Sequence, residues 1–142
     1  MVTKKSIKLN EQVNGFPIEQ TSVNFTDALT IKPIGTPNTF LVVINCHITN
    51  NGETSVDLQK LMGKPILKCG NQSFPNAEVI GEPNYVWRFY NASYKPKLSN
   101  YNQLMPNESL EGEIRFNIGN QELNATQLVF TDPPLIIDLS SG

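Results

Sequence analysis

The feature that most constrains the fold of this chain is an alternation of apolar and polar residues with a period of two. In the segment 40–49 every second residue from Phe40 to Ile48 is apolar or a cysteine, and in 110–118 the apolar set runs from Leu110 to Ile118. Successive side chains of a strand point to opposite faces of a sheet, so each segment predicts a strand with one core face. The intervening residues of the second segment predict a solvated face: Glu111, Glu113, Arg115 and Asn117.

Weaker segments of the same kind occupy most of the chain, and residues typical of turns separate them about every 8–12 residues. The further predicted strands are 6–9, 23–33, 56–62, 66–69, 85–91, 127–131 and 135–139. Asn51-Gly52 is expected to form a tight turn with positive φ angles. The pattern predicts an all-β, immunoglobulin-like β-sandwich of seven to nine antiparallel strands. It fills a single domain over residues 1–142.

Composition narrows the classes of function. The chain has a net charge of -2, whereas a nucleic-acid-binding domain normally carries a basic excess, so we expect no nucleic-acid partner. No apolar stretch approaches the roughly 18 residues needed to span a bilayer, so we expect no transmembrane segment. The charged fraction of 17% is low for an intracellular domain. We expect an extracellular or cell-surface protein whose leader has been removed; the alternative is a cytosolic protein that begins at Met1.

Two cysteines, Cys46 and Cys69, leave two alternatives open. In an exported protein they would form one disulfide, which stabilises by about 3 kcal/mol for a loop of this length. Otherwise they are two buried free thiols that pack as small hydrophobic side chains. Two thiols and one histidine are too few for a structural zinc site, and we expect no metal and no cofactor.

The order of several motifs resembles a family of proteins. Segment 7–13 (IKLNEQV) is followed by 40–53, which ends in Asn50-Asn51-Gly52, and then by 104–109 (LMPNES) and 112–118 (GEIRFNI). This order resembles an uncharacterised family of exported immunoglobulin-like domains in bacterial and archaeal surface proteins and lipoproteins. It is similar in fold to a secreted mycobacterial β-sandwich antigen. Asn107 stands where that family has glycine, and asparagine also tolerates the left-handed conformation that the turn requires. The resemblance implies a fold and no catalytic residues.

The segment 84–107 has the most uneven composition in the chain. It holds all four tyrosines and the single tryptophan, and it has no acidic residue between Asn84 and Asn107. Aromatic and cationic side chains are common at binding surfaces, whereas the alternative is that alternate aromatic residues belong to the core. The candidate binding surface consists of Trp87, Arg88, Tyr90, Tyr94, Lys95 and Lys97.

Five asparagines stand in Asn-x-Ser/Thr sequences, which are acceptors for glycosylation in exported proteins of some organisms. The alternative is that they reflect only the asparagine-rich composition. The five are Asn24, Asn71, Asn91, Asn107 and Asn124.

The sequence offers few candidates for catalytic residues. His47 has no nucleophile motif around it, and a lone histidine on a strand is usually a surface or packed residue. Glu111 and Glu113 lie about 7 Å apart along one strand face, a spacing that a glycosidase pair could use, but such neighbours are usually solvated charges.

We therefore expect a non-catalytic interaction module of the cell surface whose partner is a protein or a cell-surface polymer. The alternative is a structural or anchoring subunit of a surface assembly, such as an archaeal filament- or pilin-like β-sandwich. Exposed sheet edges allow strand addition, so a homodimer through an edge strand is a further expectation.

Overall fold

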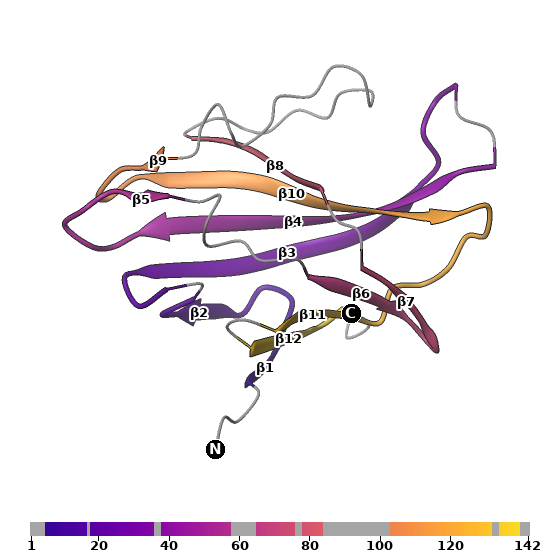
Figure 1. Cartoon of the computed structure of the whole chain (residues 1–142), viewed down its shortest axis with the longest axis horizontal. Coiled ribbons are helices and arrows are strands. Elements are labelled where there is room, and N and C mark those ends of the chain that lie inside the picture. The colour runs from indigo at the N-terminus through magenta and orange to yellow at the C-terminus, as the bar shows by residue number, and fades with distance from the viewer. Residues whose placement is uncertain are drawn as a thin grey trace.

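The computed structural model describes residues 5–16, 18–35, 38–57, 65–75, 78–83, 103–131 and 134–139. Within these ranges the regular structure consists of twelve strands (Figure 1). They are β1 (Lys5–Lys8), β2 (Gln12–Asn14), β3 (Thr21–Ile31), β4 (Phe40–Asn50), β5 (Val56–Asp57), β6 (Ile66–Cys69), β7 (Gln72–Phe74), β8 (Glu78–Pro83), β9 (Gln103–Leu104), β10 (Ser109–Gly119), β11 (Gln127–Thr131) and β12 (Pro134–Asp138). In the same part of the chain, no helix is long and apolar enough to cross a membrane.

Ten of the strands form two five-stranded sheets. Sheet A has the order β1-β12-β11-β6-β7, and sheet B has the order β2-β3-β4-β10-β8. The strands β5 and β9 form a small third sheet of two strands. The apolar faces of sheets A and B enclose one core, so the predicted all-β sandwich is confirmed.

The strands with the strongest alternation of apolar and polar residues were predicted most accurately. The strands β4 and β10 match their predicted segments to within one residue at each end, and β6 and β11 match exactly. The predicted inner faces are also confirmed, since Ile44, Ile114 and Phe116 are all fully buried. Four short strands were not predicted, so the expected number of seven to nine is too low: β2, β7, β8 and β9. The predicted strand 85–91 lies outside the described residues.

The first strand pairs in a way that the sequence did not predict. Strand β1 runs parallel to β12, with Ile7 opposite Ile137, whereas all other strand pairs in the described residues are antiparallel. Both of these isoleucines are buried in the core. The pairing therefore ties the beginning of the chain to the end of the described sequence at one edge of sheet A.

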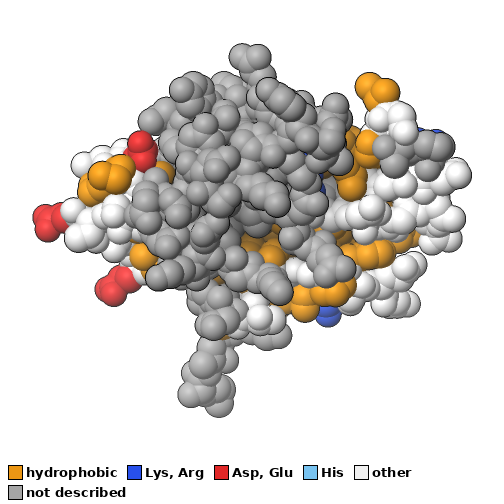
Figure 2. Space-filling model, turned by 45° about the horizontal axis from the view of Figure 1, so that its top comes forward, with side chains coloured by type: hydrophobic (Ala, Val, Ile, Leu, Met, Phe, Trp, Pro, Cys, Tyr) orange, Lys and Arg blue, Asp and Glu red, His pale blue; other side chains and the backbone are white. Residues whose placement is uncertain are grey.

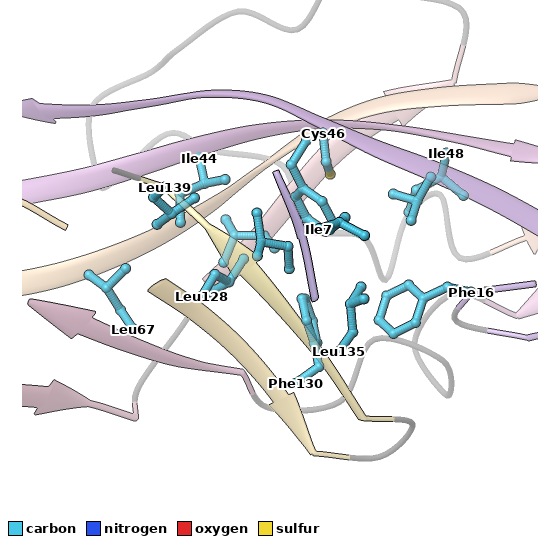
Figure 3. Close-up of a cluster of buried hydrophobic side chains, with 14 of the residues drawn as sticks. Ile7, Phe16, Ile44, Cys46, Ile48, Leu67, Leu128, Phe130, Leu135 and Leu139 are labelled. Carbon is cyan, nitrogen blue, oxygen red and sulfur yellow. The ribbon is translucent and has the colours of Figure 1, made fainter. Parts of the chain in front are cut away.

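The core lies between the two sheets and contains side chains from both (Figure 3). Phe130 of β11 packs against Phe16 edge-on, with ring centroids 5.1 Å apart, and against Phe25 of β3 at 5.9 Å. Aromatic pairs at these separations contribute about 0.5–1.5 kcal/mol beyond the area that they bury. The ring of Phe130 thus joins sheet A to sheet B near the β2–β3 connection.

Candidate functional site

The candidate binding surface predicted from the sequence lies outside the described residues. This applies to Trp87, Arg88, Tyr90, Tyr94, Lys95 and Lys97, and also to the sequon asparagine Asn91. Their role as a binding surface stays a prediction. The sites that can be built from the structure are the outer face of sheet B, the β3–β4 hairpin and a polar network at the end of β4.

The outer face of sheet B carries a ladder of cross-strand pairs between β4 and β10. At its polar end the Thr49 and Ser109 hydroxyls lie 2.9 Å apart, and His47 Nδ1 lies 3.6 Å from Glu111 Oε1. The side chains of His47 and Glu111 are 40% and 50% exposed, so this contact is a surface pair of small energy. His47 therefore lies beside a carboxylate on the surface, in agreement with the role expected for a lone strand histidine.

The middle of this face is buried, which corrects the prediction of a wholly solvated face on β10. Glu113 and Arg115 are only 6% and 5% exposed, and Arg115 Nε donates a hydrogen bond to Glu113 Oε1 at 3.1 Å. Val43 of β4, directly opposite Arg115, is 4% exposed. Periodicity correctly placed these side chains on the outer face, but it does not determine whether that face meets water.

The two glutamates that could have formed a glycosidase pair have different partners. Glu113 is buried and held by Arg115, whereas Glu111 is half exposed and lies beside His47. A glycosidase needs both carboxylates to face the same substrate, one as the acid and one as the base or nucleophile. Glu113 forms an ion pair with Arg115 on this face, and this arrangement does not favour glycoside hydrolysis.

The β3–β4 hairpin exposes apolar side chains at the other end of the face. Leu29 of β3 is 54% exposed and Ile34, in the connection to β4, is fully exposed. Ile31 and Leu41 are opposite each other on the same outer face and are partly buried. The hairpin extends past the other strands of sheet B at the right of Figure 1, and Figure 2 shows hydrophobic side chains at this end. We call residues 26–35 and 38–43 the hairpin arm.

Asn50, the last residue of β4, is the centre of a buried polar network. Its Oδ1 accepts from Gln20 Nε2 at 3.0 Å and from Gly52 N at 2.9 Å. Its Nδ2 donates to the carbonyls of Thr54 and Leu104 at 2.8 and 2.9 Å. The side chain is completely buried, so all four of its hydrogen bonds are made inside the protein.

The main chain of Asn50 completes the same network. Its N–H donates to the Glu108 carbonyl at 3.0 Å, and its carbonyl accepts from Asn107 N at 2.8 Å. The segments 50–53 and 104–109, which carry the family resemblance, therefore meet at this residue. Asn107 has a φ of 65°, so the predicted left-handed turn at this position is confirmed. No pattern in the sequence predicted that the two segments would touch.

The predicted tight turn at Asn51-Gly52 is wrong. Neither residue has a positive φ, and the chain continues from β4 into β5, which pairs with β9 instead of returning beside β4. Glycine is required at position 52 for space, since an added Cβ would lie less than 3 Å from three atoms of the Gln20 side chain. That side chain is the one that bonds Asn50 and the Thr54 carbonyl.

Of the two alternatives left open for Cys46 and Cys69, the structure has the second: both thiols are free and buried. Cys46 lies on the inner face of β4 among the side chains of the core (Figure 3). Burial, together with the smaller effect of the nearby charge of Glu113, raises the pKa of the Cys46 thiol to about 12. Burial also raises the pKa of Cys69. A protonated, buried thiol is a poor nucleophile, and both behave as small hydrophobic residues.

Three of the sequon asparagines lie at exposed positions. Asn71 is in the turn between β6 and β7, Asn107 is in the turn before β10, and Asn124 is in the connection from β10 to β11. Asn24 is partly buried on β3. Whether any of them carries a glycan stays a prediction. Among the described residues, no three His, Cys, Asp or Glu side chains come together as a metal site would require.

The two packed sheets define a β-sandwich protein, and a comparison with solved structures agrees at the level of the fold. The chain is similar to the crystal structure of an uncharacterized β-sandwich protein from Clostridium difficile 630, with a TM-score of 0.64. The likeness covers 99% of this chain and 97% of that one, with 8% sequence identity. No family model matches the sequence, and no curated protein does. At this identity the likeness is one of fold.

Proposed function

We propose that this chain is a non-catalytic interaction module of the cell surface or the extracellular space. The observation that carries the proposal is the exposure of Leu29 and Ile34 on the hairpin arm. Apolar side chains gathered on one exposed element are typical of surfaces that bind another molecule. Four titratable side chains of the outer face pair with each other, His47 with Glu111 and Arg115 with Glu113.

The proposed partner is a protein or a cell-surface polymer. The aromatic and cationic residues of the segment 84–107 would supply further contacts, since tyrosine, tryptophan and arginine contribute strongly to binding energy. We further propose membership of the exported immunoglobulin-like domains that the sequence motifs resemble. A structural subunit of a surface assembly is the second candidate, and it would polymerise where an interaction module would not.

The binding proposal is tested with labelled protein on cell envelopes from the source organism. We expect saturable binding by the wild type, and a loss of about tenfold or more in affinity for Ile34→Lys, because a charge replaces an apolar contact. The double variant Arg88→Glu with Tyr90→Ala is expected to lose binding as well. All variants should unfold at the denaturant concentration of the wild type.

Asn120→Lys is the matched control, because Asn120 is also an exposed turn residue and the change adds the same charge. It should bind as the wild type does. Absence of saturable binding, or binding by Ile34→Lys and the double variant at wild-type affinity, would contradict the proposed function.

A further inference from the structure

Among the residues that the structure describes, no strand pairs with one side of β3 along the hairpin arm, which makes this side an open sheet edge. Strand β2 pairs with β3 only over residues 22–24, and Asn10 N donates to the Phe25 carbonyl at 2.7 Å. From Thr26 to Ile31, the strand pairing in the described residues is with β4 alone, on the opposite side. Thr26, Asp27 and Leu29 are exposed here. An open edge of this length is a template for another strand.

A bulge determines which backbone groups this edge presents. The Phe25 carbonyl points toward the β2 side, and the register with β4 shifts between Phe25 and Asp27. After the bulge Asp27 pairs with Asn45, so the regular alternation of an antiparallel ladder turns Leu29 toward β4. The N–H and C=O groups of Ala28 and Thr30 then point to the open side. These four groups are the ones that a further strand would bond.

The charges of the edge favour an antiparallel copy of itself. Asp27 lies at one end of the open stretch and the exposed Lys32 lies just beyond the other end. Parallel pairing in register would set Asp27 beside Asp27 and Lys32 beside Lys32, whereas the antiparallel register places Asp27 opposite Ile31 and Lys32 opposite Thr26 of the other copy. Pro33 follows Lys32 and cannot donate to a ladder, which ends the pairing before it reaches the partner's β2.

We propose that two copies of this chain form a homodimer by antiparallel pairing of their β3 edges about a two-fold axis at Leu29. In this register Ala28 of each copy bonds Thr30 of the other, and the two Leu29 residues form the central pair that is not hydrogen-bonded. Side chains are closest in such pairs, with Cα atoms about 4.5 Å apart. The pair would remove from water an apolar side chain that is 54% exposed in the monomer.

Two substitutions at one residue test this dimer. Leu29→Lys places two like charges on the axis and should weaken dimerisation about tenfold or more, measured by sedimentation over a concentration series. Its unfolding should match the wild type. Leu29→Cys should form an intermolecular disulfide under mild oxidation, because a Cα separation of about 4.5 Å lies within the range that disulfides span.

Gln72→Cys is the matched control for cross-linking, because Gln72 is an exposed residue on β7, the edge strand of sheet A. Rapid cross-linking of Leu29→Cys, slow cross-linking of Gln72→Cys and a weakened Leu29→Lys dimer would support the proposal. It is overturned if the wild type stays monomeric at millimolar concentration, if Leu29→Lys associates as tightly as the wild type, or if the two cysteine variants cross-link equally. This test is independent of envelope binding, since it uses the purified chain alone.

Discussion

Phe116→Ala is expected to lower the free energy of unfolding by about 3–5 kcal/mol, the usual cost of deleting a fully buried aromatic side chain. Phe116 lies on β10 with no exposed surface, opposite Val42 on the central strand of sheet B. The alanine leaves a cavity in the core, which the surrounding side chains can fill only in part. The measurement is equilibrium unfolding in denaturant, followed by circular dichroism.

Phe116→Leu is the matched control, since it keeps much of the volume and should cost clearly less than the alanine variant. A loss below about 1 kcal/mol for Phe116→Ala would mean that the side chain does not contribute to the core in solution. The facing of β10, and with it the assignment of inner and outer faces in sheet B, would then be wrong.

Asn50→Ala is expected to cost about 3 kcal/mol or more, because the substitution removes four hydrogen bonds from one buried side chain. The buried Leu104 carbonyl would lose its amide donor, whereas the Thr54 carbonyl would keep its bond from Gln20 Nε2, and a buried polar group left without a partner costs about 1–3 kcal/mol. The measurement is again denaturant unfolding. Asn120→Ala, at an exposed turn, should stay within about 0.5 kcal/mol of the wild type.

Asn50→Asp tests the contribution of the hydrogen bonds separately from that of side-chain shape, because the two side chains have nearly the same shape. The carboxylate keeps the two acceptor positions but turns a negative oxygen toward the Thr54 and Leu104 carbonyls. We expect this variant to be less stable at neutral pH than at acidic pH, because protonation restores one donor and removes the charge. Equal stability of Asn50→Asp and the wild type at neutral pH would show that the network does not hold these segments together.

The sequence predicted those parts of the fold in which apolar alternation is strong. The strands β4, β6, β10 and β11 were found because each has a regular apolar face. The strand β8 was missed because its sequence EVIGEP contains glycine and proline and only a short apolar stretch. The parallel direction of β1 depends on pairing with a strand almost at the other end of the chain, and periodicity carries no information about direction.

The candidate site was less predictable than the fold. The burial of Glu113 and Arg115 depends on what lies over the outer face of sheet B, which no pattern within β10 records. The role of Asn50 depends on contacts with residues about thirty to fifty positions away, among them Gln20 and Leu104. The free thiols likewise follow from where β4 and β6 place the two cysteines, because cysteine spacing does not fix a pairing.

The most direct test of the account is to locate the native protein in its source cells and to measure its intact mass. We predict that it is found at the surface or in the medium, with a mass that a glycan or a lipid raises above that of the bare chain. Both thiols should be free, with no loss of the two hydrogens that a disulfide removes. A bare chain beginning at Met1 and recovered from the cytosol would contradict the proposed location, and the proposed function with it.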